Sequence, residues 1–365
     1  IIDKHYQSMP PLKLERFAGN PILTPDRRCA WERACTTNPG AWYDGRTVRM
    51  LYRAGPDTAA HPIYFGLAES RDGFHFKRVS RQPVFGPSAD GFDAGCVEDA
   101  RIVKFGDTYA VVYAARAFPP GAYWKKNISL TAFTPALPAE APAAARHNLT
   151  RSGLALTRDF KTWHRLGPIT DATVDNRDAI LFPERIGKQF ALLHRPATWT
   201  GPRYGCDRPS MWISLSPDLL AWEQHHLLAT PAYDWEALKI GGSTPPIKTP
   251  RGWLTLYHGV DVGRVYRAGA MLLDLHDPRR ILARLPEPIL EPEAPYERIG
   301  LVPNVVFPTG NVVIGDRLFV YYGGADRVCC VATIGLRDLL DALQRHPWPA
   351  RRAKRRRPKA RTSGG

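Results

Sequence analysis

The segments Thr108-Tyr-Ala-Val-Val-Tyr-Ala-Ala115 and Gly153-Leu-Ala-Leu-Thr-Arg-Asp-Phe-Lys-Thr-Trp163 form one copy of a pattern that recurs along the chain. Both segments are rich in the apolar, β-branched and aromatic residues that favour strands. The second segment of a copy often ends in Ser/Thr-x-Asp, followed by Trp or Phe. The other four copies pair 48–54 with 63–76, 189–196 with 211–222, 252–260 with 268–277, and 317–326 with 328–334.

Five self-similar β units of roughly 50 to 75 residues indicate radial repetition. Helical periodicity is scarce until 336–343, where we expect one short C-terminal helix. The sequence therefore predicts an all-β fold, a five-bladed β-propeller over residues 1–345. Residues 1–37 are expected to be an irregular lead-in. Residues 117–150 interrupt the second unit as a long inserted loop of the kind that is usually a lid or disordered.

Charge is concentrated at one end of the chain. The formal net charge is +15, and residues 351–361 hold eight basic residues and no acid, which leaves +7 for the remainder. We expect 346–365 to be a disordered basic tail. Such a tail either keeps the protein in solution or contacts a polyanion such as nucleic acid or anionic lipid. The smaller net positive charge of the rest of the chain favours an anionic substrate. Nucleic acid is not expected to be the main partner.

Several protein classes are excluded by composition. No run of 18 apolar residues is present, so no membrane span is expected. The first residues lack a secretory pattern. The six cysteines include no CxxC pair and no zinc spacing, so we expect no metal site and a reducing, cytoplasmic setting.

The stretch Gly95-Cys-Val-Glu-Asp-Ala-Arg-Ile102 places two acids before an apolar strand. Neighbouring side chains on a strand point to opposite faces, so only one of Glu98 and Asp99 is expected to enter a given cavity. Acids in separate environments can hold different protonation states, as acid catalysis requires. The alternative is structural: one acid caps a turn and pairs with Arg101.

In a propeller, the strand ends of all five units converge on one central funnel. The groups expected there are rich in cations, and several cations beside a few carboxylates suit a phosphate or another oxyanion. Trp and Tyr faces suit sugar rings. The converging groups are Glu98, Asp99, Asp178, Asp326, Arg53, Arg101, Arg177, Arg195, Lys239, His258, Arg267, Asn38, Tyr257, Tyr266, Trp42 and Trp124.

An ordered set of motifs then resembles a known family, the mannoside phosphorylases of glycoside hydrolase family 130. The matching segments are Asn38-Pro-Gly-Ala, Leu51-Tyr-Arg-Ala, Val97-Glu-Asp-Ala-Arg, Asp178-Ala-Ile-Leu-Phe-Pro-Glu-Arg-Ile, Leu193-His-Arg-Pro, Lys239-Ile-Gly-Gly-Ser-Thr-Pro-Pro-Ile, Tyr257-His-Gly-Val, Val302-Pro-Asn-Val-Val-Phe-Pro and Tyr321-Tyr-Gly-Gly-Ala-Asp. The family is a five-bladed propeller, in agreement with the repeat count. One departure is Ala100, where the family's Glu-Asp-Pro-Arg motif has proline.

The resemblance implies a reaction and a set of roles. Asp99 matches the family's general acid, which protonates the glycosidic oxygen of a β-mannoside through the mannose 3-hydroxyl. Phosphate, the co-substrate, then attacks with inversion to give α-mannose 1-phosphate, and no cofactor is implied. The implied phosphate-binding residues are Arg177, Arg195, Lys239, His258 and Tyr266. The implied substrate-binding or supporting residues are Asn38, Arg53, Glu98, Arg101 and Asp326.

Two alternatives to phosphorolysis stay open at this point. An inverting β-mannosidase of the same fold would use water and a second carboxylate as base. A non-catalytic glycan-binding propeller would keep the sugar contacts without chemistry. The linkage, the acceptor sugar (mannose, glucose or N-acetylglucosamine) and any homo-oligomer are also left open by the sequence.

Overall fold

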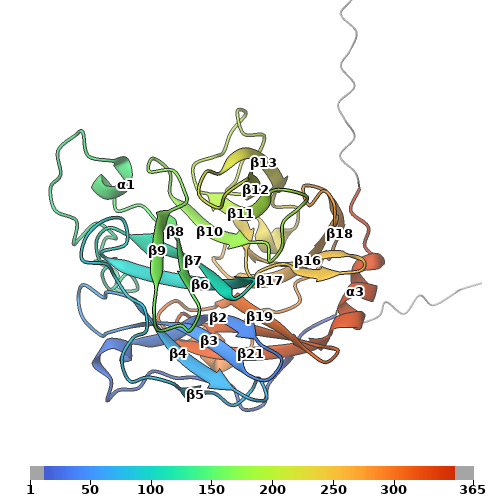
Figure 1. Cartoon of the computed structure of the whole chain (residues 1–365), viewed down its shortest axis with the longest axis horizontal. Coiled ribbons are helices and arrows are strands. Elements are labelled where there is room, and N and C mark those ends of the chain that lie inside the picture. Colours follow the sequence, from blue (N-terminus) through green and yellow to red (C-terminus); the bar gives the residue numbers. More distant parts are fainter. Residues whose placement is uncertain (1–11, 350–365) are drawn as a thin grey trace, which may run out of the picture.

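The computed structural model describes residues 12–349 and shows five antiparallel sheets arranged as the blades of a propeller (Figure 1). The expected five-bladed, all-β fold is thus confirmed. Blade 1 comprises β2 (Cys35–Tyr43), β3 (Val48–Gly55), β4 (Tyr64–Ser70) and β5 (Lys77–Arg78). Blade 2 comprises β6 (Cys96–Phe105), β7 (Thr108–Arg116), β8 (Arg151–Thr157) and β9 (His164–Pro168).

The remaining blades follow the same order of strands. Blade 3 comprises β10 (Asn176–Leu181), β11 (Phe190–Pro196), β12 (Met211–Ser216) and β13 (Glu223–Ala229). Blade 4 comprises β14 (Lys239–Gly242), β15 (Ile247–Thr249), β16 (Gly252–Val260), β17 (Tyr266–Leu273) and β18 (Ile281–Arg284). Blade 5 comprises β19 (Val306–Ile314), β20 (Arg317–Gly324), β21 (Val328–Gly335) and β1 (Glu15–Arg16). The repeated segments of the sequence are the second and third strands of each blade.

The two ends of the described chain close the ring. Strand β1 pairs with β21, with Glu15 opposite Thr333 and Arg16 opposite Ala332. Arg16 also bonds Glu297 at 2.8 Å. The expectation of an irregular lead-in is therefore wrong at this point, because two of its residues complete the last blade. Strand β1 thus ties the start of the described chain into the last blade, which closes the ring between the last blade and the first.

Five hydrophobic cores hold the blades together, and each core lies between two neighbouring blades. Strand alternation explains this arrangement, since each sheet presents one set of apolar side chains to the blade before it and another to the blade after it. The C-terminal helix α3 (Leu336–Gln344) covers the core between blades 4 and 5 with Leu339, Leu340 and Leu343. This helix confirms the one expected at 336–343.

Residues 117–150 are mostly irregular, with one short helix, α1 (Ala143–Arg146), and they project from blade 2 (Figure 1). Their first part is tied to blade 1 by backbone bonds from Gly121 N to Ala60 O and from Ala122 N to Ala59 O, both 3.0 Å. A further single-turn helix, α2 (Pro295–Arg298), precedes β19. None of the helices within 12–349 is long and apolar enough to cross a membrane.

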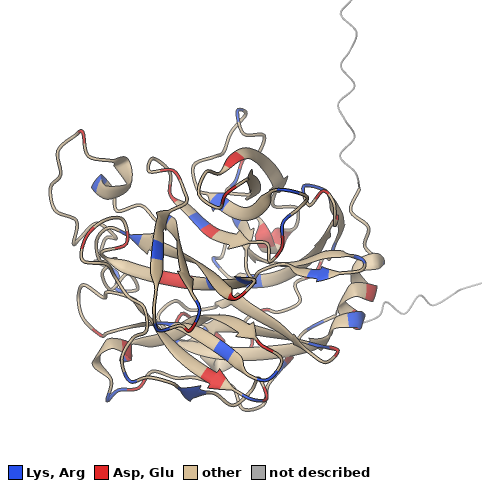
Figure 2. Cartoon of the chain, viewed as in Figure 1, with Lys and Arg blue, Asp and Glu red and all other residues tan. Residues whose placement is uncertain are grey.

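Charged residues of both signs are interspersed over the loops and strands (Figure 2). The expected disordered tail 346–365 is wrong in its first residues, because Arg284 N donates to His346 O at 3.1 Å and Trp348 N donates to Leu282 O at 2.9 Å, which holds 346–349 against blade 4. The basic segment 351–361 lies outside the described residues.

A bulge near the start of the innermost strand shapes the centre of the first three blades. The register of the first two strands shifts between Thr37 and Gly40 in blade 1, between Glu98 and Arg101 in blade 2, and between Arg177 and Ile180 in blade 3. A left-handed residue lies in each bulge: Asn38 (φ 45°), Asp99 (φ 56°) and Asp178 (φ 55°). Asn and Asp tolerate this conformation better than other non-glycine residues.

The bulge overturns the expectation that Glu98 and Asp99 face different cavities. A bulge inserts a residue and re-aims the side chain, so simple alternation fails locally. Both carboxylates line the same central pocket.

Close approach of the inner strands requires Gly40. A Cβ at this position would lie 2.4 Å from the carbonyl oxygen of Ala100 in the next blade. That atom belongs to a backbone that cannot swing aside, so blades 1 and 2 would have to separate.

We predict that Gly40→Ala lowers the free energy of unfolding by about 1–3 kcal/mol, the usual cost of overpacking. Urea and thermal unfolding measure the change. Gly263→Ala is the matched control, since its nearest contact is a side-chain oxygen of Asp261 at 3.2 Å and not a backbone atom. Equal stability of the two variants would contradict the close approach.

Candidate active site

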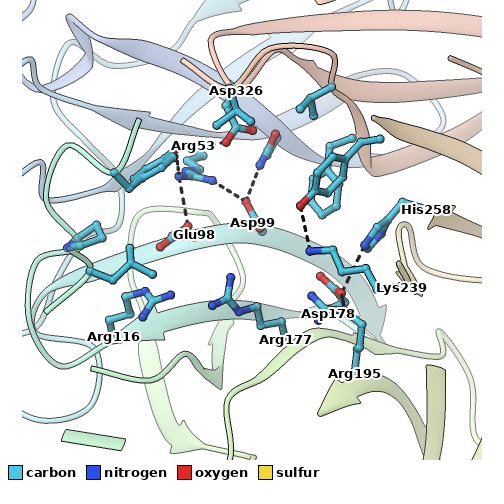
Figure 3. Close-up of a pocket in the computed structure, with 18 of the residues that line it drawn as sticks. Arg53, Glu98, Asp99, Arg116, Arg177, Asp178, Arg195, Lys239, His258 and Asp326 are labelled. Atoms are coloured by element: carbon cyan, nitrogen blue, oxygen red, sulfur yellow. Dashed lines mark hydrogen bonds and ion pairs between the residues drawn. The ribbon is translucent and has the colours of Figure 1, made fainter. Parts of the chain in front are cut away.

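A cavity of about 370 Å³ opens where the inner strands begin, and it gathers most of the charged residues expected in the funnel (Figure 3). Its polar lining consists of Asn38, Arg53, Glu98, Asp99, Arg116, Tyr123, Arg177, Asp178, Arg195, Lys239, His258, Tyr266 and Asp326. Its apolar lining consists of Pro120, Ile128, Leu130, Val302, Val305 and Phe307. All five blades contribute to this lining.

Arg53 organises one half of the cavity. Its Nη2 lies 3.2 Å from Glu98 Oε2, and its Nη1 lies 3.3 Å from Asp99 Oδ1. Asn38 Nδ2 donates a 2.8 Å bond to the same oxygen of Asp99. Burial alone would raise the pKa of Glu98, but the charges of Arg53 and Arg116 outweigh burial and lower it. Glu98 is therefore a carboxylate at neutral pH.

Asp326 faces the same arginine from blade 5 and behaves differently. Tyr123 OH donates to Asp326 Oδ2 at 3.3 Å and accepts a 2.8 Å bond from Arg53. Burial raises the pKa of Asp326, and the nearby charges of Asp99 and Glu98 raise it further, against the effect of Arg53. One arginine thus lies beside three carboxyl groups, and the pKa values of two of them, Glu98 and Asp326, are shifted in opposite directions.

The other half of the cavity is cationic. Arg177 Nε bonds Asp175 at 2.6 Å, and Arg195 Nε bonds Asp178 at 2.6 Å. Lys239 Nζ donates to Tyr266 OH at 2.9 Å and has no carboxylate partner within residues 12–349. Burial, helped by the charge of Arg195, lowers the pKa of Lys239 to about 7. A buried ammonium without a counterion favours an incoming anion.

His258 adds hydrogen-bonding capacity rather than charge. Burial lowers its pKa to about 3, so the imidazole is neutral at neutral pH. Its Nε2 lies 3.7 Å from Asp178 Oδ2, and its Nδ1 is buried without a hydrogen-bond partner among residues 12–349. Figure 3 shows His258, Lys239, Asp178 and Arg195 together on one side of Asp99, away from Arg53.

Arg101 lies behind the cavity rather than in its lining. Its guanidinium donates to the carbonyl oxygens of Asp99 at 2.7 Å and Ser243 at 3.1 Å. The expectation that it binds substrate is therefore replaced by a positioning contact. The side chain is 2% exposed and holds the backbone of the bulge that carries Asp99.

Four other residues expected in the funnel lie elsewhere, and two of them, Tyr257 and Arg267, do so because alternation turns them away from it. Tyr257 is buried between blades 3 and 4, and its neighbour His258 points into the cavity. Arg267 pairs with Asp261 at 2.7 Å, whereas Tyr266 lines the cavity. Trp42 packs against the core between blades 1 and 2. Trp124 lines a neighbouring hollow.

Arg116 is the main residue of the cavity that the sequence analysis missed. Arg116 is the last residue of β7 and pairs with Cys96 on β6. The basic residues Arg53, Arg195 and His258 lie at the same place in their own blades, near the end of the second strand. The recurrence of a basic residue at this place in the repeat could have identified it. Burial and the neighbouring Arg177 lower its pKa.

Comparisons with known proteins agree with this arrangement. Residues 143–345 match the profile of a family described as beta-1,4-mannooligosaccharide phosphorylase. The chain is 37% identical to a 1,2-beta-oligomannan phosphorylase of Thermoanaerobacter sp. (strain X514) over 90% of this chain and 99% of that protein. It is 34% identical to a beta-1,2-mannobiose phosphorylase of the same organism over 88% and 97% of the two chains.

A solved structure shows the same architecture. The beta-1,2-mannobiose phosphorylase of Listeria innocua, in complex with beta-1,2-mannobiose, superposes with a TM-score of 0.75 at 27% identity and covers 92% of this chain and 100% of its own. Fold, site and relatives together define the protein as an enzyme of the glycoside phosphorylase class. Within that class, the chain belongs to glycoside hydrolase family 130.

The lowered pKa of Lys239 predicts that anion binding depends on pH. Lys239 is charged below about pH 7 and neutral above it, so an anion binds with uptake of a proton at higher pH. Sulfate is a suitable probe because its charge is constant from about pH 6 to 9. The groups around Lys239 do not titrate in this range: the pKa of Asp178 is lowered by Arg195 against the effect of burial, and burial raises that of Tyr266.

We expect the dissociation constant of sulfate, measured by calorimetry, to rise by up to tenfold per pH unit above about 7. Lys239→Arg keeps its charge and should flatten this profile. Equal affinity of the wild-type protein for sulfate at pH 6 and 9 would show that Lys239 does not contribute a titrating charge.

Proposed function

We propose that this protein catalyses the inverting phosphorolysis of β-mannosides and releases α-mannose 1-phosphate. The observation that carries the proposal is the division of one cavity into a carboxyl half and a cationic half with an unneutralised Lys239. The substrate we favour is β-1,2-linked, because the two relatives matched over 99% and 97% of their length bear 1,2-linked names. The name of the family profile refers to 1,4-linked oligosaccharides, which makes that linkage the alternative.

The proposed reaction uses the two halves on opposite sides of the anomeric carbon. Asp99 gives its proton to the mannose 3-hydroxyl, which passes a proton to the glycosidic oxygen as the bond from that oxygen to C1 breaks. A phosphate oxygen held by Arg177, Arg195 and Lys239 forms the new bond to C1 from the other side. The configuration inverts, and the departing sugar carries away the proton.

The supporting roles follow from the contacts. Asn38 and Arg53 fix the carboxyl group of Asp99, and Arg101 fixes its backbone. Asp326 and Tyr123 complete the wall that would hold the mannose hydroxyls. His258 and Tyr266 supply hydrogen-bonding groups to phosphate beside Lys239.

Hydrolysis is less well supported by the geometry. An inverting hydrolase needs a free carboxylate base for water opposite the acid. Of the lining residues on the cationic side, Asp178 is the one carboxylate, and Arg195 already bonds it at 2.6 Å. Arg195 and Arg101 lower the pKa of Asp178 despite its burial, which makes it a weak base. Phosphate needs no such base, because cations hold it in place.

The first test is dependence on phosphate. With β-1,2-mannobiose, we expect α-mannose 1-phosphate and mannose in equal amounts when phosphate is present and negligible cleavage when it is absent. Lys239→Gln should raise the KM for phosphate roughly tenfold or more, because a charged hydrogen bond is lost. Cleavage at the same rate without phosphate, giving mannose alone, would establish a hydrolase.

The second test separates the acid from its neighbours. Asp99→Asn should lower kcat about 10²–10⁴-fold on mannobiose. An aryl β-mannoside with a nitrophenol leaving group needs no protonation, so this variant should keep most of its activity on it. Asp326→Asn is the matched control, because loss of a mannose contact affects both substrates. If Asp326→Asn shows the selective loss instead, Asp326 is the general acid.

A further inference from the structure

A second hollow of about 580 Å³ adjoins the central cavity. Its lining consists of Arg27, Arg33, Ala34, Asp57, Trp124, Leu301 and Arg327. These residues come from loops that precede the innermost strands or follow the second strands. The central cavity lies at the same strand ends, so the two hollows share one face of the propeller.

The two hollows share a wall. Tyr123 lines the central cavity, and Trp124 lines the second hollow. Val302 and Asp326 also line the central cavity, and their neighbours Leu301 and Arg327 line the second hollow. Three separate segments therefore place consecutive residues on either side of the divide. A ligand that extends out of the central cavity past Tyr123 would therefore meet the second hollow.

The second hollow has unneutralised positive charge. Three guanidinium groups line it, against the single carboxylate of Asp57. Within residues 12–349, none of Arg27, Arg33 and Arg327 forms an ion pair, and Arg33 Nε donates to the carbonyl oxygen of Arg27 at 3.1 Å. The exposed Arg28 nearby does have a partner, Asp26 at 3.1 Å. Arginines held around a hollow without carboxylates attract an anion.

Trp124 gives the hollow a fixed apolar surface. Its ring packs edge-on against His61 at 4.5 Å and against Tyr123 at 5.2 Å. His61 is buried and is itself held by a 2.7 Å contact between its Nδ1 and the carbonyl oxygen of Pro56. An aromatic surface beside hydrogen-bond donors is the usual composition of a site for a small polar ligand.

We propose that this hollow binds an anionic group, a carboxylate or a phosphate, on the part of the substrate that lies beyond the scissile bond. This inference rests on the proposed function, because it assumes that the mannose to be transferred occupies the central cavity. The part of the substrate that leaves through the mouth of the cavity would stack on Trp124 and place its anion among the three arginines.

The test compares neutral and anionic substrates of the same length. β-Mannobiose and β-mannotriose are converted to their aldonic acids by oxidation of the reducing end, and phosphorolysis is followed by release of mannose 1-phosphate. A second anionic arm uses mannobiose with a phosphate at its reducing-end sugar. We expect at least one anionic substrate to have a kcat/KM roughly tenfold above that of its neutral parent, with a preference that weakens as salt is raised.

The arginine variants test the site itself. The triple variant Arg27→Gln, Arg33→Gln, Arg327→Gln should reduce the anionic-to-neutral ratio of kcat/KM roughly tenfold. Arg28→Gln, outside the hollow, is the matched control and should leave the ratio as in the wild-type protein.

Two outcomes overturn the inference while leaving phosphorolysis intact: no preference for any anionic substrate, or a preference that the triple variant retains. A preference for neutral mannotriose over its acid would identify the hollow as a subsite for uncharged sugars. Failure of every substrate, neutral or anionic, to yield mannose 1-phosphate would instead overturn the proposed function.

Discussion

The bulged starts of the inner strands are the constraint on which the site depends. A regular strand would send Glu98 and Asp99 to opposite faces, and one of these charges would then lie in the apolar core between blades. The left-handed conformation of Asp99 prevents this and turns both acids into the cavity. Such a backbone costs about 1–3 kcal/mol per residue and persists only where its surroundings hold it. Here Arg101 bonds the carbonyl oxygen of Asp99 from behind.

Once several charges are gathered in one cavity, their pairing decides what the cavity can do. Arg53 stabilises the carboxyl half, where Glu98 has a lowered pKa and Asp326 a raised one. Asp175 and Asp178 pair with Arg177 and Arg195 in the other half, and no carboxylate within the described chain, 12–349, pairs with Lys239. Removing one partner of a buried ion pair leaves an unpaired charge, which strongly destabilises the folded protein. Substitutions in these pairs are therefore expected to be destabilising. In the free enzyme, the cation without a carboxylate partner is thus on the side where the proposed nucleophile, phosphate, would bind.

The repeats in the sequence predicted the fold because apolar alternation is strong in the second and third strands of every blade. Closure by β1 was missed because a strand of two residues, Glu15–Arg16, has no periodicity to detect. The motifs placed most of the candidate site residues in one funnel. The errors at Tyr257 and Arg267 follow from alternation, because adjacent residues on a strand face opposite sides.

Bulges cannot be located from alternation, which is why the joint orientation of Glu98 and Asp99 came only from the structure. The charge state of His258 likewise depends on burial, which the sequence does not report. Arg116 could have been found, since it occupies the place of Arg53 and Arg195 in the repeat.

The proposed function requires phosphate to lie on the cationic side of the sugar, opposite Asp99. A crystal structure of the Asp99→Asn variant with β-mannobiose and phosphate tests it directly. We predict phosphate density in contact with Lys239 Nζ and the guanidinium groups of Arg177 and Arg195, with one oxygen facing C1 of the mannose. Phosphate bound beside Arg53, or mannobiose bound with water at C1 and no anion near Lys239, would contradict the account.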